Sequence, residues 1–196
     1  MSRSFSITYD YLCPFARIAN ETVVEALADG SAWDVDFVPF PLAQSHVEEG
    51  EADVWDRPAG DPGARGVVAL QWSLAIKQLF PEQFSAFHVA LFDARHSNAA
   101  DVDDETLLRE LATAAAIDAD AVADHVAGGA PMKQLAAHHG ELVDRWDVFG
   151  VPTFIDGDEA VFVRLMERHQ RGDVERVLDM LEWSRLNEFK RTRIPR

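Results

Sequence analysis

Residues 9–17 read YDYLCPFAR and hold the only cysteine of this 196-residue chain, Cys13. The residues just before, 4–9, alternate polar and apolar side chains and are rich in strand formers, which predicts a short β-strand. Pro14 suits the first turn of an α-helix, because the N–H that proline lacks would have no partner there. The sequence therefore predicts that Cys13 lies where a strand ends and a helix begins.

A cysteine at such a junction faces free backbone N–H groups and the positive end of the helix dipole. Both favour the thiolate, which is the nucleophilic form of the side chain. We therefore predict that Cys13 is a partly exposed, catalytic thiol with a lowered pKa. The alternative is a buried cysteine that serves only as a small apolar residue of the core.

Outward from this junction, the sequence predicts a βαβ unit. Apolar residues recur at helical spacing from Pro14 to about Ala28, and Asp29-Gly30 is a typical helix end. Residues 33–40 then alternate as a second strand before two prolines end it. A strand, a helix and a strand in this order predict two parallel strands joined by a right-handed crossover.

The rest of the chain predicts a helical region between two groups of strands. Residues 42–60 are polar and acidic, which is typical of a loop. The further expected elements are helices at 62–80, 81–95, 103–116, 118–127 and 130–147, strands at 152–155 and 160–163, and a last helix at 173–189. The order β-α-β, helices, β-β-α predicts an α/β fold with a mixed four-stranded sheet, helices on its faces and an inserted helical domain.

Two motifs in this layout resemble those of the DsbA-like branch of the thioredoxin superfamily. CPFA at residues 13–16 is similar to the family's Cys-Pro-x-Cys motif, and GVPTF at residues 150–154 is similar to its cis-proline loop. The resemblance covers nearly the whole chain. It implies a thioredoxin fold, with a discontinuous thioredoxin-like domain at residues 1–41 and 148–196 and an inserted helical domain at residues 62–147.

The resemblance also implies a site. It implies that the Val151–Pro152 bond is cis, lies close to Cys13 and exposes the Val151 backbone to an extended ligand. Tyr11 and Phe15 flank the thiol; they either shape a pocket for an apolar substrate or cover the edge of the sheet. The expected site residues are Cys13 as the catalytic thiol, Pro14, Phe15 and Ala16 as the rest of its motif, and Tyr11, Val151, Pro152 and Thr153 as residues that bind the substrate or thiol. We assign no functional role to Asp10 from the sequence.

The motif departs from the family's pattern at Ala16, which stands where the family has its second, resolving cysteine. A dithiol site uses that second thiol to resolve a mixed disulfide. The expected activity is therefore that of a monothiol oxidoreductase or thiol-dependent transferase that forms a mixed disulfide. Glutathione or mycothiol is the expected co-substrate, and no tightly bound cofactor is expected.

Two alternatives to a monothiol oxidoreductase remain open. Kappa-class glutathione transferases and 2-hydroxychromene-2-carboxylate isomerases are similar to this chain in plan, so an enzyme of that kind is one alternative. The other is a redox-silent protein that binds a peptide or small molecule in the groove between Cys13 and Pro152.

The amino-acid composition limits the classes of molecule that we expect this protein to bind. With 18 Lys and Arg against 34 Asp and Glu, the formal net charge is −16, and such a surface repels nucleic acid and anionic membranes. No stretch is apolar enough to span a membrane, residues 1–5 do not read as a signal peptide, and one cysteine cannot form an internal disulfide, so we expect a cytoplasmic protein. The seven histidines lack metal-binding spacing, so no metal is expected. The expected partner is a small thiol or a peptide or protein thiol.

Overall fold

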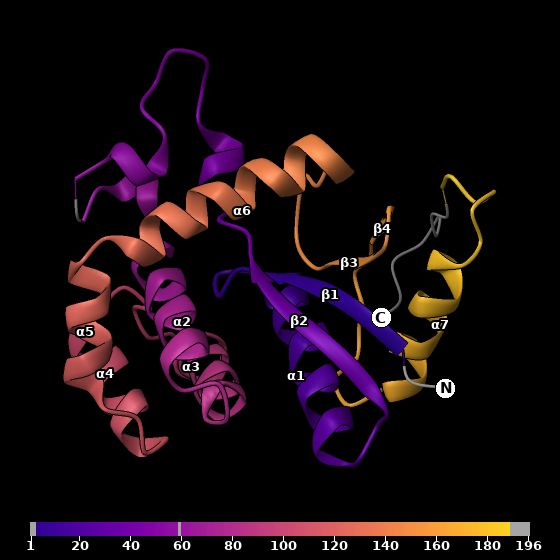
Figure 1. Ribbon diagram of the computed structural model, residues 1–196, viewed down its shortest axis with the longest axis horizontal. Coiled ribbons are helices and arrows are strands. Elements are labelled where there is room, and N and C mark those ends of the chain that lie inside the picture. The colour runs from indigo at the N-terminus through magenta and orange to yellow at the C-terminus, as the bar shows by residue number, and fades with distance from the viewer. Residues whose placement is uncertain (1–2, 59, 189–196) are drawn as a thin grey trace.

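The computed structural model describes residues 3–58 and 60–188, and its centre is a mixed four-stranded sheet (Figure 1). The strands are β1 (Arg3–Tyr9), β2 (Trp33–Pro39), β3 (Thr153–Asp156) and β4 (Glu159–Phe162), in the order β2-β1-β3-β4. β1 runs parallel to β2 and antiparallel to β3, and β4 pairs antiparallel with β3. This confirms the predicted α/β thioredoxin-like fold and its βαβ start.

Seven α-helices complete the described part of the fold. They are α1 (Pro14–Ala28), α2 (Val67–Leu79), α3 (Phe84–Asn98), α4 (Glu105–Ala114), α5 (Ala119–Ala127), α6 (Ala130–Trp146) and α7 (Arg171–Leu181). α1 packs against β1 and α7 against β3 and β4, while α6 contacts β2. Figure 1 shows α2–α5 gathered beyond the ends of β1 and β2, with α6 reaching from them along the sheet. The division into a discontinuous and an inserted domain stays a prediction.

Two helix boundaries differ from those predicted by five residues or more. The helix expected from residue 62 begins at Val67, because Gly66 has a left-handed backbone (φ +86°). The carboxylate of Asp103 accepts the N–H groups of Gly66 (2.6 Å) and Ala69 (3.3 Å) at this start. The last helix stops at Leu181, where its buried apolar face ends; part of its predicted extension, Phe189, lies outside the described residues.

A buried histidine joins the helical region to the sheet. His88 of α3 has no exposed surface. Its Nε2 lies 3.2 Å from Oδ1 of Asn20, and its Nδ1 lies 2.8 Å from the hydroxyl of Tyr11. Since the Asn20 amide nitrogen donates to the Ala16 carbonyl (2.9 Å), Oδ1 is the acceptor, so Nε2 carries the proton and Nδ1 lies unprotonated beside the Tyr11 hydroxyl. Burial lowers the pKa of His88 to about 3, so the ring is neutral.

Five aromatic rings surround this imidazole, with ring centroids 4.6–5.4 Å from it. They are those of Tyr9, Tyr11, Phe37, Phe84 and Phe92. The hydroxyls of Tyr9 and Tyr11 lie 2.7 Å and 2.8 Å from Ser73 Oγ of α2. The cluster therefore connects β1, α1, α2 and α3 through satisfied polar groups inside an aromatic core.

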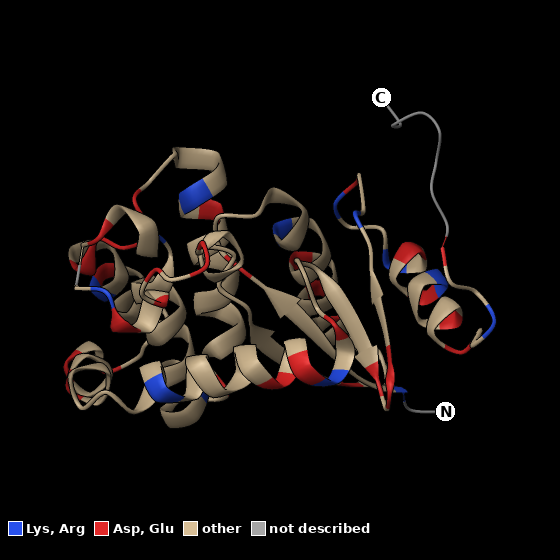
Figure 2. Cartoon of the chain, turned by 90° about the horizontal axis from the view of Figure 1, so that it is seen from above, with Lys and Arg blue, Asp and Glu red and all other residues tan. Residues whose placement is uncertain are grey.

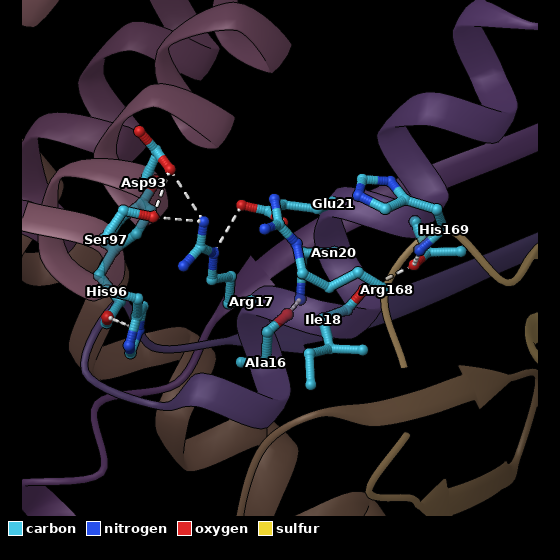
Figure 3. Close-up of polar contacts among 12 residues, drawn as sticks. Ala16, Arg17, Ile18, Asn20, Glu21, Asp93, His96, Ser97, Arg168 and His169 are labelled. Atoms are coloured by element: carbon cyan, nitrogen blue, oxygen red, sulfur yellow. Dashed lines mark hydrogen bonds and ion pairs between the residues drawn. The ribbon is translucent and has the colours of Figure 1, made fainter. Parts of the chain in front are cut away.

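An ion-pair network crosses the same boundary at the side of α1 (Figure 3). Arg17 donates to the carboxylate of Glu21 (2.8 Å) on α1 and to Asp93 (2.9 Å) on α3. The second oxygen of Glu21 lies 2.6 Å from the guanidinium of Arg168, in the loop between β4 and α7. The Arg17 and Glu21 side chains are 9% and 3% exposed. The network thus ties three segments of the chain together around a buried carboxylate.

Charged residues occur on many elements of the described chain rather than on one. Figure 2 shows Asp and Glu spread over helices and loops and outnumbering Lys and Arg.

Within the described residues, no helix has both the length and the apolar composition needed to cross a bilayer.

Candidate functional site

Cys13 caps the N-terminus of α1, as the sequence predicts. Its backbone is extended, and α1 begins at the next residue, Pro14. The sulfur accepts the N–H of Ala16 at 3.4 Å, and the thiol donates to the carbonyl of Val151 at 3.4 Å. The sulfur therefore lies between the first turn of a helix and a loop that is 138 residues away in the sequence.

That loop contains the predicted cis peptide bond between Val151 and Pro152. Thr153 fixes the loop on both sides: its N–H donates to Thr8 Oγ1 and its hydroxyl donates to the Gly150 carbonyl, each at 2.8 Å. The structure thus brings Val151 and Pro152 next to Cys13, as the paired motifs imply. The carbonyl of Val151, which we expected to face a ligand, is occupied by the thiol.

The accessibility and pKa that we predicted for Cys13 are wrong. The residue is only 8% exposed, because the Val151 loop covers the sulfur. This burial raises the pKa of the thiol above its ordinary value, although the N–H groups of Ala16 and Phe15 act in the opposite direction. The helix N-terminus does favour the thiolate here, but the loss of hydration outweighs it.

Asp10, to which the sequence assigned no role, anchors the loop that carries the thiol. Its side chain is completely buried, and its two oxygens accept the N–H groups of Leu12 and Leu42, each at 2.8 Å. Burial raises the pKa of Asp10 to about 6, against the lowering effect of these two hydrogen bonds. The charge of Asp10 also contributes to the raised pKa of Cys13. This carboxyl group therefore fixes the loop at the cost of opposing thiolate formation.

The two aromatic residues beside the thiol have different roles. Tyr11 has no exposed surface and its hydroxyl belongs to the His88 cluster, so of our two alternatives for this side chain the structure shows the packing one. Phe15 is half-buried, and the guanidinium of Arg164 lies over its ring at 5.2 Å. Ala16, in the place of a second cysteine, has no exposed surface.

Sequence reasoning missed an aromatic surface with one cation beside the thiol. Arg164 also lies over the ring of Phe162, at 5.5 Å. Phe149, which is 70% exposed, packs on Phe162 with ring centroids 5.0 Å apart. These residues and Phe15 come from three separate segments of the sequence, so no local motif could have indicated them. We call Phe15, Phe149, Phe162 and Arg164 the aromatic–arginine surface.

Two cavities lie elsewhere. The larger, about 500 Å³, is on the face of the sheet beside α6, between residues such as Ser6, Asp36 and Glu141. The smaller, about 300 Å³, lies between Leu12 and residues 42–65. Among residues 3–58 and 60–188, no three His, Cys, Asp or Glu side chains are placed to hold a metal ion together.

Structures of known proteins share this fold. A 2-hydroxychromene-2-carboxylate isomerase matches with a TM-score of 0.65 at 17% identity, over 91% of this chain and 95% of that one. The cytosolic disulfide reductase DsbM from Pseudomonas aeruginosa matches with a TM-score of 0.62 at 15% identity, over 92% of this chain and 99% of that one. A probable DsbA oxidoreductase from Streptomyces coelicolor matches with a TM-score of 0.64 at 19% identity, over 95% of this chain and 92% of that one. No curated protein sequence matches this chain.

A family model extends the comparison from fold to family. The DSBA-like thioredoxin domain matches residues 68–169, a range that includes most of the helical region, the cis-proline loop and Arg164 but not Cys13. This range covers more than half of the chain, and it agrees with the resemblance that the two motifs carry. The chain therefore belongs to the family of DSBA-like thioredoxin domains.

Proposed function

We propose that this protein exchanges thiols through Cys13 alone, by forming a mixed disulfide with a small thiol such as glutathione or mycothiol or with a peptide or protein thiol. The observation that supports this most is the position of the sulfur, between the first N–H groups of α1 and the carbonyl of Val151. The structure of DsbM, whose fold this chain shares, was solved with GSH. A small thiol and a reducing, cytoplasmic setting are therefore part of the proposal.

The proposed exchange conserves atoms and electrons. The Cys13 thiol loses its proton to solvent, and the thiolate attacks one sulfur of a disulfide. A new bond forms between Cys13 and that sulfur, the original S–S bond breaks, and the second sulfur leaves as a thiolate with the electron pair. Because the chain has no second cysteine, a second small thiol from solution must attack the mixed disulfide and release Cys13.

One observation favours a second candidate, a redox-silent protein that binds a peptide or small molecule beside Cys13 and Pro152. The thiol is 8% exposed and its pKa is raised, whereas reactive cysteines usually have a lowered pKa and an accessible sulfur. In this alternative the thiol donates to Val151 and does not react, and the ligand lies beside Cys13 and Pro152 against the aromatic–arginine surface.

The two functions predict different reactions with glutathione disulfide. Under the proposed function, the folded protein forms one adduct at Cys13, and the adduct disappears with excess glutathione. Because burial raises the pKa of the thiol, the rate should still increase with pH above about 8.5, where an ordinary thiol is already half ionised. Intact-mass spectrometry at pH 7, 8, 9 and 10 measures both the adduct and its rate.

Two controls make this experiment decisive. Cys13→Ser should give no adduct at any pH, because no other cysteine exists. The protein unfolded in urea supplies the rate of an accessible thiol at each pH. If the folded protein reacts only as fast as it unfolds, Cys13 is not an exchange site and the proposed monothiol function is wrong.

A further inference from the structure

Arg164 is held near the thiol by contacts on both sides of it in the β4–α7 loop. Before it, Val163 donates its N–H to the carbonyl of Pro152 at 3.2 Å. After it, the Arg168 guanidinium lies 2.6 Å from buried Glu21, and the N–H of His169 donates to Thr22 Oγ1 at 3.1 Å (Figure 3). The loop is therefore fastened to the cis-proline segment at one end and to α1 at the other. These are the two segments that hold the sulfur of Cys13.

The guanidinium of Arg164 rests on aromatic rings rather than on a carboxylate. It lies 5.2 Å from the ring centroid of Phe15, two residues after Cys13, and 5.5 Å from that of Phe162. Its positive charge lowers the pKa of Cys13, although less than burial raises it. Phe149 extends the same surface toward solvent. A cation thus stands at the edge of an accessible apolar surface beside the sulfur.

The absence of a carboxylate partner distinguishes Arg164 from its neighbours. Arg168 pairs with Glu21, Arg171 with Glu175 at 3.0 Å and Arg176 with Asp173 at 2.6 Å. Within residues 3–58 and 60–188, Arg164 makes no ion pair and no hydrogen bond, in a chain where acidic residues outnumber basic ones by 34 to 18. Its hydrogen-bond donors are therefore available to an anion from outside this part of the chain.

We propose that Arg164 binds a carboxylate of the molecule that reacts with Cys13, while the apolar part of that molecule lies on Phe15, Phe149 and Phe162. The substrate class is then a carboxylate-bearing small disulfide, and neutral and cationic disulfides are poor substrates. A planar guanidinium suits this role because it donates two parallel hydrogen bonds to a carboxylate. The proposal rests on the proposed function, since it selects among the partners in the same exchange at Cys13.

Three small disulfides of similar size but different charge test this selection. They are 3,3′-dithiodipropionate, which is anionic, bis(2-hydroxyethyl) disulfide, which is neutral, and cystamine, which is cationic. The second-order rate constant of mixed-disulfide formation is measured for each at fixed pH by intact-mass spectrometry. We expect Arg164→Gln to slow the anionic reagent about tenfold relative to the neutral one, and to speed the cationic reagent. The difference should shrink as salt is added, because the site is exposed to solvent.

Two further variants separate recognition from other effects. Arg164→Lys keeps the charge but loses the paired geometry, so it should retain part of the preference. Arg185→Gln makes the same charge change at an exposed residue beyond α7, whose last turn contacts Arg3 at the opposite end of β1. It should leave the order of the three rates unchanged.

The outcomes distinguish this proposal from the function on which it rests. If all three reagents react and Arg164→Gln changes their rates equally, exchange at Cys13 stands and carboxylate recognition is wrong. If none of the three reacts with the folded protein, the proposed exchange itself is wrong. If Arg164→Gln lowers the rate selectively for the anionic reagent, the result supports both exchange at Cys13 and carboxylate recognition by Arg164.

Discussion

Replacing His88 with alanine is expected to destabilise the protein by about 3–5 kcal/mol, which combines a cavity in the core with the loss of hydrogen-bond partners. The imidazole has no exposed surface and lies among five aromatic rings. Its removal leaves Tyr11 and Asn20 without the partner that links them. Urea denaturation followed by circular dichroism measures the free energy of unfolding. His46→Ala, at an exposed residue that ends a short 3₁₀ helix between β2 and α2, is the matched control and should change it by less than about 0.5 kcal/mol.

The same variant should also change the pH dependence of stability. Folding lowers the pKa of His88 to about 3, whereas the unfolded side chain has about 6.5. The stability that neutral His88 contributes is therefore fully present above pH 6.5 and is lost as the pH falls toward 3. Between pH 7 and pH 4 this linkage amounts to about 3 kcal/mol.

Asp10 changes the pH dependence of stability in the opposite direction to His88. The informative quantity is therefore the difference in the free energy of unfolding between wild type and His88→Ala at each pH, rather than the pH dependence of the wild type alone. The pKa of Asp10 is raised to about 6, and the stability from its protonated form is therefore lost as the pH rises from about 3.8 through 6. This contribution is common to both proteins and cancels in their difference. If the difference in stability between wild type and His88→Ala does not decrease as the pH falls from 7 to 4, the neutral, buried state of His88 is wrong.

Replacing Arg17 with methionine should destabilise the protein by about 2–4 kcal/mol, because the buried carboxylate of Glu21 loses one of its two cationic partners. The Glu21 side chain is 3% exposed, and only Arg168 would remain beside it. Methionine fills much of the volume of arginine, so the expected loss is electrostatic rather than a cavity effect. The measurement is again the free energy of unfolding in urea.

A double variant tests this explanation. Arg17→Met with Glu21→Met replaces the buried pair by apolar side chains and should recover most of the lost stability. Asp93 and Arg168, which are 53% and 42% exposed, can then turn to solvent. Arg109→Met removes two exposed ion pairs, with Glu105 and with Asp120, and should cost no more than about 1 kcal/mol. A double variant as unstable as the single one would contradict a buried, charge-based role.

Much of the fold could be predicted because its elements are encoded locally. The alternation before Tyr9, the proline after Cys13 and the helical spacing that follows are all short-range signals, and the structure has each element where they place it. The cis bond before Pro152 came from the resemblance rather than from spacing. The start of α2 could not be predicted, because the carboxylate that caps it, Asp103, lies 37 residues from Gly66 in the sequence.

The site was predicted less well because its properties depend on distant residues. A helix N-terminus can be recognised from Pro14, but the burial of Cys13 comes from Val151, 138 residues away. Tyr11 appears beside the thiol in the sequence, yet its hydroxyl turns to His88, 77 residues away. The guanidinium of Arg164 lies over the rings of both Phe15 and Phe162, and these rings come together only in the folded chain. Charge and hydration around the sulfur are therefore tertiary properties.

The separation of Cys13 from its cover also has a consequence in time. The thiol precedes Val151 by 138 residues, so at translation rates of about 5–20 residues per second the ribosome releases it roughly 7–28 seconds before the loop that buries it. Throughout that interval the nascent cysteine is an ordinary, hydrated thiol, open to any oxidant near the ribosome. The newborn chain is consequently more vulnerable at this sulfur than the finished protein, and the last strands of the sheet end that vulnerability when they pair.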